Sequence, residues 1–386
     1  MSYGTLALIV AIGLLGPALA LLPTRVAPPV VIGEIAAGIA FGHTGTHTID
    51  ATQPTLAFLA DIGFALLMFI VATNLPLRDA RIRGAARRGL LATALTVAGA
   101  IALSPALAAL TGLHRPAVLA VLIASSSAAI VLPILGTRDR DEALLVTIAW
   151  VSFADVATVL AVPFVLSSGS FGRALAGALL IVAGATAVGL VGRRLVGLEP
   201  VEALRDESHH MAWALDLRLS LLVLFALAWI AERFDTSALL AGFAAGVMVS
   251  LLGEPRRVAD QLIGLGEGFF VPLFFVVLGA RLDLAAMVHS RDDLLLFALL
   301  TVATTGVPVA VAAITRLPLS SGLLAAAEMG VPAAVAALGL ASNVLRPGQA
   351  AAIMGAAAVS LAVASVGAAR LGPGWSVNPR APDAGG

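Results

Sequence analysis

The hydrophobic positions of this chain gather into long runs that short polar loops separate. Thirteen of these runs have about the length that crosses a bilayer, although several are short or interrupted by Gly and Pro. The pattern predicts an all-α, polytopic membrane protein of about 13 transmembrane helices. The predicted spans are roughly 4–22, 28–42, 56–76, 89–111, 116–135, 143–167, 174–192, 213–232, 237–252, 267–280, 292–315, 319–342 and 348–369.

Composition supports this class of fold. Hydrophobic residues make up 60% of the 386 and charged residues only 12%, whereas a soluble domain carries about twice that charge. The net charge of zero gives no indication of a nucleic-acid partner. The chain has no cysteine, which excludes disulfides, thiolate metal sites and cysteine nucleophiles.

The arginines predict the topology. With the N-terminus outside, the inner loops and tail hold 17 arginines and the outer loops hold 6. We therefore expect a cell-membrane protein with a cytosolic C-terminus, and we interpret the first run as a retained helix. Residues 1–370 form the predicted membrane domain, in which 193–212 is a cytosolic linker. Residues 371–386, rich in Pro and Gly, form a predicted disordered tail.

Asp155 stands alone near the middle of the apolar run 143–166. About 11 or 12 residues on either side place it close to the bilayer midplane at ~1.5 Å per residue. A carboxylate there costs several kcal/mol unless it is paired, hydrated or protonated. The position predicts a group that carries protons or ions.

Two spans in corresponding halves of the chain are polar and interrupted. The second of them carries Glu328, Gly330 and Pro332, and the first carries Pro133 preceded by a run of hydroxyls: Ser125, Ser126 and Ser127. Such spans can unwind and expose carbonyls and half-helix ends that coordinate cations, which points to an inverted-repeat secondary transporter with its site between them. Alternatively, the small residues only allow close helix packing.

Other polar residues give weaker signals. Glu34 and Asp61 lie near span ends, where structural roles such as capping or reaching the interface are favoured. His43 and His47 lie beside Asp50, but the Gly between the two histidines favours a loop over a metal site. No intramembrane-enzyme motif accompanies the acids, so we do not expect an enzyme.

Four longer stretches are distinctive: PPVVIGEIAAGIAFG (28–42), ASSSAAIVLPILGTRDRDEALL (124–145), SALLAGFAAGVMVS (237–250) and GFFVPLFFVVLGARLDL (268–284). With the Asp155 helix, they make the chain similar to the monovalent cation:proton antiporter-2 branch of the sodium/proton exchangers over about residues 5–370. The resemblance implies a homodimer, in which a dimerisation domain supports a mobile core with two crossed, broken helices around an acidic site. The serine run matches one broken helix, 328–339 matches the other, and Asp155 matches the ion-binding aspartate.

Three positions depart from that family pattern. Members that work electrogenically have two adjacent aspartates, and Ala154 stands at the first position here. Val307 occupies the place of a basic residue that many members have, and the arginine often found before the family's Gly-Glu pair is missing around Ala326. The departures leave the stoichiometry open.

Burial disfavours a charged carboxyl and cation coordination favours it, so one aspartate can bind a proton or a cation in turn. We expect electroneutral antiport of a proton for Na⁺ or K⁺ at Asp155, with serine hydroxyls, unwound carbonyls and Glu328 contributing. The expected partners are the lipid bilayer and these ions, with no cofactor. Three alternatives stay open: a carrier of another solute, a membrane sensor or scaffold without transport and, less favoured, a channel.

Overall fold

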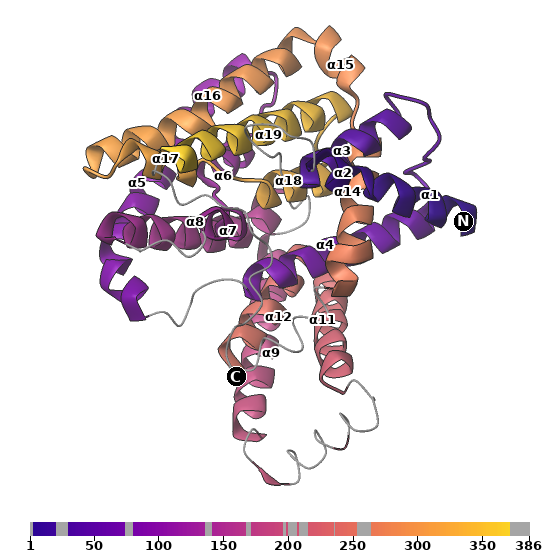
Figure 1. Cartoon of the computed structure of the whole chain (residues 1–386), viewed down its shortest axis with the longest axis vertical. Coiled ribbons are helices and arrows are strands. Elements are labelled where there is room, and N and C mark those ends of the chain that lie inside the picture. Colours follow the sequence, from indigo (N-terminus) through magenta and orange to yellow (C-terminus); the bar gives the residue numbers. More distant parts are fainter. Residues whose placement is uncertain are drawn as a thin grey trace.

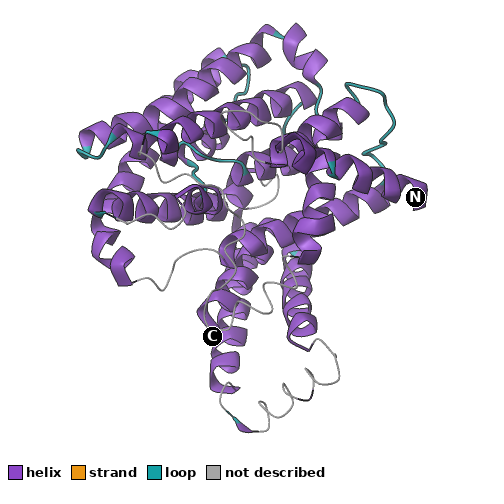
Figure 2. Cartoon of the chain, viewed as in Figure 1, coloured by secondary structure: helices purple, strands orange, loops and turns teal. Residues whose placement is uncertain are grey.

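The described part of the computed structural model consists of helices joined by turns and loops, without a strand (Figure 2). It covers residues 3–20, 30–73, 80–135, 141–166, 171–195, 198–199, 207, 215–234, 236–252 and 264–370. The predicted tail 371–386 and most of the predicted linker 193–212 lie outside these residues.

The helices follow the predicted runs with shifts of a few residues at most ends. Their bounds are α1 Tyr3–Gly13, α2 Leu15–Ala20, α3 Val30–Phe41, α4 Pro54–Thr73, α5 Ala80–Leu110, α6 Pro116–Ala124, α7 Ala128–Leu135, α8 Glu142–Leu166, α9 Phe171–Leu195, α11 Leu215–Arg233, α12 Ala238–Leu252, the π-helix η1 Gly266–Phe270, α14 Val271–Arg281, α15 Leu284–His289, α16 Arg291–Ile314, α17 Leu319–Ala325, α18 Gly330–Ala341 and α19 Pro347–Ala369.

Seven segments of the described chain are long and apolar enough to cross a membrane, and three shorter apolar helices accompany them. The number of crossings, thirteen, therefore stays a prediction. One short element, α15, has no counterpart among the predicted runs. It begins where the Asp283 carboxylate accepts a hydrogen bond from Ala286 N at 2.8 Å, the geometry of an N-cap.

The helices pack in two groups (Figure 1). The first group, called the core group here, contains α5–α8 and α16–α19, whose members contact one another extensively. The second, called the scaffold group, contains α1–α4, α9, α11, α12, η1 and α14. Within it, α9, α11 and α12 form a lobe that projects from the rest, and α12 packs along α4. The two groups meet chiefly where α8 contacts α9 and α12, where α14 contacts α18 and where α15 leads into α16.

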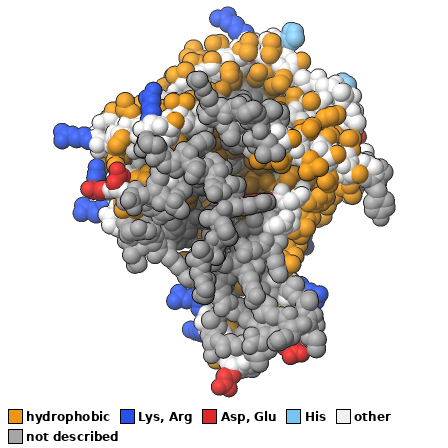
Figure 3. Space-filling model, viewed as in Figure 1, with side chains coloured by type: hydrophobic (Ala, Val, Ile, Leu, Met, Phe, Trp, Pro, Cys, Tyr) orange, Lys and Arg blue, Asp and Glu red, His pale blue; other side chains and the backbone are white. Residues whose placement is uncertain are grey.

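Glycines let helices of the scaffold group approach closely. A Cβ atom at Gly242 or Gly246 of α12 would overlap the backbone carbonyl oxygen of Ala65 or Phe69 in α4. Small residues at such spacing are typical of helix pairs in membranes, where close backbone contact replaces the missing hydrophobic driving force. On the face in Figure 3, apolar side chains cover much of the described surface and charged side chains lie at its edges, as expected of a membrane protein.

Candidate functional site

The first broken helix unwinds at the three serines that separate α6 from α7. Ser125 has an extended backbone (φ −71°, ψ 150°), and its hydroxyl donates to Leu122 O at 2.8 Å. Serine hydroxyls compete in this way with the helical hydrogen bonds of the backbone. The structure corrects the expectation that Pro133 takes part in the unwinding, because this proline lies inside α7. A proline frees only the carbonyl four residues before it, which is beyond the serines.

The second broken helix unwinds between α17 and α18, over residues 326–329. Glu328 lies in the break, and its Oε1 accepts a hydrogen bond from Val331 N at 2.8 Å. The carboxyl thus caps the start of α18, whose first N–H groups have no partner within the helix. Pro332 stands in the first turn of α18, where its missing N–H costs nothing.

The two breaks cross in space. Ser127 N donates to Ala327 O at 2.8 Å, so the unwound backbone of one helix satisfies the unwound backbone of the other. Helix α18 contacts both α6 and α8. The structure therefore confirms the predicted pair of crossed, broken helices, and it brings the serine run and Glu328 to one place.

Asp155 lies at this crossing and is only 3% exposed. Its Oδ2 accepts a hydrogen bond from Ala128 N, the first residue of α7, at 3.1 Å. The rotation of α8 is fixed by α5: Trp150 Nε1 donates to Thr96 Oγ1 at 3.1 Å, and Thr93 Oγ1 donates to Trp150 O at 3.2 Å. An Asp155 side chain facing lipid, far from the broken helices, would have contradicted the expected role.

The electrostatics of the crossing favour a bound cation or proton. Asp155 lies near enough to Glu328 for its negative charge to act on that carboxyl. Each acid also receives a hydrogen bond from the N-terminal turn of a half-helix, the positive end of the helix dipole. The half-helices offset part of the charge, and a cation or proton between the carboxyls would relieve the repulsion that is left.

Three buried oxygens around the breaks have no hydrogen-bond partner among the described residues: Glu328 Oε2, Ser126 Oγ and Ser152 Oγ. An unsatisfied buried polar atom costs about 1–3 kcal/mol, so each requires an explanation such as water or an ion. Carboxylate, hydroxyl and carbonyl oxygens are the donors that hard cations prefer. The site has the ligand chemistry of such a cation.

Sequence reasoning missed two serines near the site. Ser152 precedes Asp155 by three residues, a spacing that places both on one face of α8, and this signal was readable in the sequence. Ser360 of α19 is 1% exposed, and its Oγ lies 3.5 Å from Glu328 O and 2.7 Å from Ala357 O. Nothing in the sequence relates Ser360 to Glu328, since only tertiary packing brings α19 against the break.

The positions that depart from the family pattern add no charge to the crossing. Ala154 is buried and its carbonyl accepts the Thr158 hydroxyl at 2.7 Å. Val307 packs toward α5. A Cβ atom added at Gly99 of α5 would lie 3.2 Å from Cγ1 of Val307. Among the described residues, no arginine forms an ion pair with Asp155 or Glu328.

The other predicted polar residues belong to the scaffold group. Glu34 is buried and packs close to Gly16 of α2, so its structural role stays a prediction. Asp61 of α4 interacts electrostatically with the positive charge of Arg281 at the end of α14. His43 Nδ1 lies 3.6 Å from Asp283 Oδ2, and no group of three or more His, Cys, Asp or Glu with metal-binding geometry occurs in the described chain.

A cavity of about 620 Å³ lies where the loop after α3 faces the end of α18 and the start of α19. Its lining includes His47, Asp50, Arg281, Leu340 and Ala341, so it is bounded by both helix groups. Hydrogen bonds from the hydroxyl and the N–H of Thr52 lower the pKa of Asp50, which keeps this rim carboxyl anionic. The cavity gives water a place beside the second broken helix.

Comparison with solved structures shows the fold. The sodium/proton antiporter MjNhaP1 of Methanocaldococcus jannaschii aligns with a TM-score of 0.59 over 94% of both chains, at 16% sequence identity.

Sequence comparison finds antiporters as relatives. The chain is 29% identical to the Na⁺/H⁺ antiporter NhaS5 of Synechocystis over 321 residues, which are 79% of this chain and 43% of that protein. It is 26% identical to the Na⁺/H⁺-K⁺ antiporter GerN of Bacillus cereus over 277 residues, or 68% of this chain and 67% of GerN. The chain spans less than half the length of the first of these relatives.

The family comparison covers almost the whole chain. The sequence profile described as "Sodium/hydrogen exchanger, transmembrane" matches residues 7–371. This match includes both broken helices, Asp155 and Glu328. The relatives of the chain are named as antiporters, which are transporters rather than enzymes. The chain therefore belongs to the sodium/hydrogen exchanger family.

Proposed function

We propose that this protein is a secondary antiporter that exchanges a proton for Na⁺ or K⁺ at Asp155. The observation that carries the proposal is the placement of Asp155: it is 3% exposed and lies at the crossing of two unwound helices. Burial without a fixed cationic partner disfavours the bare anion, so the carboxyl requires a proton or a cation. The named activities of NhaS5 and GerN agree with this exchange.

The proposed cation ligands come from three segments. Asp155 supplies a carboxylate from α8, the first break supplies the hydroxyls and carbonyls of Ser125, Ser126 and Ser127, and the second break supplies the carboxyl of Glu328. Ser126 Oγ and Glu328 Oε2 support this set, since both are buried without a hydrogen-bond partner in the described chain. Na⁺ and K⁺ both suit oxygen ligands, and the names of the relatives include both ions.

The neutral states of Asp155 carry the exchange. Asp155 with a proton, or as an anion with one monovalent cation, adds no net charge to the core group and can pass the apolar barrier. The unloaded carboxylate is held back by the desolvation of its charge. With Ala154 and Val307 at the departing positions, one proton exchanges for one cation, and the cycle is electroneutral.

Asp155→Asn tests the assignment in everted vesicles, with a pH-sensitive dye and added Na⁺, K⁺ or Li⁺. Asparagine keeps the size of the side chain but cannot hold a proton or a charge. We expect cation-driven proton flux to fall to background, at unchanged protein abundance. Glu142→Gln is the matched control because Glu142 lies on the same helix with an exposed side chain paired to Arg88, and such pairs contribute little. Flux that persists in Asp155→Asn would contradict the proposal.

The proposal includes the setting of the protein: the cell membrane, an outer N-terminus, a cytosolic C-terminus and a homodimer. The arginine distribution supports the orientation. The dimer is supported by the family resemblance. Cross-linking in native membranes tests it: a species of twice the monomer mass is expected, and a monomer at all cross-linker concentrations would contradict the dimer.

A further inference from the structure

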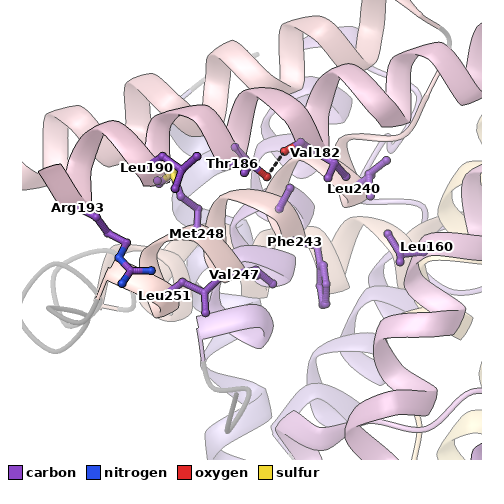
Figure 4. A pocket seen from close by; sticks show the side chains of 13 residues that line it. Leu160, Val182, Thr186, Leu190, Arg193, Leu240, Phe243, Val247, Met248 and Leu251 are labelled. Atoms are coloured by element: carbon purple, nitrogen blue, oxygen red, sulfur yellow. Dashed lines mark hydrogen bonds between the residues drawn. The ribbon is translucent and has the colours of Figure 1, made fainter. Parts of the chain in front are cut away.

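The lobe formed by α9, α11 and α12 carries an apolar groove on its surface. It lies between α9 and α12, with Leu160 of α8 at one end, and has a volume of about 240 Å³ (Figure 4). Ala185 and Gly189 leave room along α9, while Phe243 and Met248 line the opposite wall from α12. Neighbouring apolar side chains on α9, such as Leu179 and Leu190, are exposed, so the groove opens to the surroundings of the protein.

The lining offers almost no polar group along its length. Thr186 Oγ1 donates to Val182 O at 2.7 Å within its own helix, so this hydroxyl is satisfied (Figure 4). The lining positions of α9 run from Val182 to Arg193, which corresponds to about 16 Å at ~1.5 Å per residue. This length is about half of the ~30 Å hydrocarbon core, the depth that one lipid leaflet occupies.

A single charged side chain lies at one end of the groove. Arg193, in the last turn of α9, is exposed and lines the groove beside Leu251, as Figure 4 shows. No ion pair joins it to another residue of the described chain. Its planar guanidinium can form two parallel hydrogen bonds to a phosphate. The arginine distribution predicts that this end of α9 is cytosolic, and the cytosolic leaflet is the anionic one.

We propose that this groove binds one anionic phospholipid, with an acyl chain between α9 and α12 and the headgroup phosphate on Arg193. An acyl chain is thin and apolar, and it suits the length of the groove and its dry lining. The proposal is independent of the ion that the protein exchanges.

The proposed lipid contacts the helix that carries Asp155. Leu160 lies five residues after Asp155 on α8 and is the part of the core group that lines the groove. An acyl chain at Leu160 therefore lies between the core group and the scaffold group, where α8 contacts α9 and α12. Its presence stabilises one relative position of the two groups.

Native mass spectrometry of the detergent-purified full chain tests the proposal with two probes of equal chain length, phosphatidylglycerol and phosphatidylcholine. We expect one tightly retained phosphatidylglycerol on the unmodified protein, retained at least fivefold more than phosphatidylcholine. Arg193→Gln is expected to remove this preference. Arg194→Gln is the matched control, because Arg194 is the adjacent exposed arginine and does not line the groove, and it should keep the preference.

A groove-filling variant provides a second, independent test. Ala185→Leu places extra methyl groups into the groove without changing charge and is expected to reduce retention of both lipids. Thermal unfolding of each variant without lipid shows whether it is folded; if Ala185→Leu is not, Thr186→Leu fills the same groove from the next residue of α9. Equal phosphatidylglycerol retention in Arg193→Gln and Arg194→Gln would overturn the headgroup assignment. Unchanged retention in the groove-filling variants, or a second copy of the chain instead of lipid, would overturn the groove.

Discussion

At the scale of single residues, the candidate site consists of groups that the fold leaves partly unsatisfied. Asp155 accepts one hydrogen bond, from Ala128 N, while Ser126 Oγ, Ser152 Oγ and Glu328 Oε2 accept or donate none among the described residues. A stable core satisfies its buried polar atoms, because each unmet group costs about 1–3 kcal/mol. An arrangement of this kind is stable when a cation, a proton or water completes it.

Ser152→Ala tests whether this hydroxyl is a ligand. Removing one of several oxygen ligands is expected to raise the half-saturating cation concentration about fivefold, which corresponds to ~1 kcal/mol, and to leave the maximal rate unchanged. Dye-based flux at a series of Na⁺ concentrations measures both quantities. Ser365→Ala is the control, since Ser365 Oγ bonds to Leu361 O within α19. An unchanged half-saturating concentration in Ser152→Ala would remove this hydroxyl from the ligand set.

Glu328→Gln separates the charge of this carboxyl from its capping role. Glutamine can still accept the hydrogen bond from Val331 N, so α18 is expected to fold normally. The loss of charge next to Asp155 is expected to weaken cation binding at least tenfold. Thermal unfolding measures the capping role, and the cation dependence of flux measures the role of the charge. A lower unfolding temperature with unchanged cation affinity would assign Glu328 a structural role only.

At the scale of elements, two kinds of contact hold the site in place. The broken helices satisfy each other through Ser127 N and Ala327 O, and α8 is fixed against α5 by the indole of Trp150. The scaffold group instead depends on close backbone approach, with Gly242 and Gly246 of α12 against α4. The core site therefore depends on directional hydrogen bonds, whereas the support depends on small side chains.

Gly246→Ala tests the close approach of α12 and α4. The added Cβ would overlap Phe69 O, which belongs to the backbone and cannot rotate away, so a loss of about 1–3 kcal/mol is expected. Gly306→Ala in α16 is the control, because a Cβ there has no neighbour within 4 Å and alanine favours a helix. Thermal unfolding in detergent should place Gly246→Ala below the parent protein and Gly306→Ala at or above it. Equal unfolding temperatures of the two variants would show that α12 is not tightly packed on α4.

At the scale of the whole molecule, two helix groups face each other across the cavity of about 620 Å³. If the proposed exchange proceeds by movement of the core group against the scaffold group, this cavity is expected to open and close. Its lining contains Leu340 and Ala341 from the core group and Arg281 from the scaffold group, so its accessibility reports their relative position. The chain has no cysteine of its own, which allows single cysteines to be labelled without background.

Ala341→Cys reports this movement through labelling with a membrane-impermeant maleimide in right-side-out vesicles. The labelling rate is expected to change several-fold between saturating Na⁺ and Na⁺-free buffer at constant pH. Thr48→Cys is the control, because Thr48 is exposed on the loop after α3 and does not line the cavity. A labelling rate that is the same with and without Na⁺, in a transporting variant, would contradict movement at this boundary.

The stoichiometry is tested in proteoliposomes with equal K⁺ on both sides. If one proton exchanges for one Na⁺, then clamping the membrane potential at zero with valinomycin is expected to leave the Na⁺-driven proton flux unchanged. Electrogenic exchange builds a membrane potential that slows further exchange. Valinomycin would remove this potential and accelerate the proton flux. Such an acceleration would mean that a second charge moves in each cycle. Glu328, the carboxyl next to Asp155, would be the candidate to carry it.

The sequence by itself determined the class of fold and the runs that form most helices, and it singled out Asp155 as the candidate carrier. It could do so because an apolar run of bilayer length must form a helix to satisfy its backbone, and because an isolated acid within such a run is costly. The family resemblance further indicated the two broken helices. The neighbour of Glu34 could not be read from the sequence, since its burial depends on the packing of helix α2.

Only the tertiary structure decided which polar atoms meet. Ser127 and Ala327 are 200 residues apart, and Ser360 reaches the carbonyl of Glu328 from another helix, so no local pattern relates them. The groove between α9 and α12 and the cavity at the end of α18 are likewise seen only in the tertiary structure. Hydropathy fixes which residues enter the membrane, but helix rotation and packing fix which side chains face one another, and those depend on contacts across the whole chain.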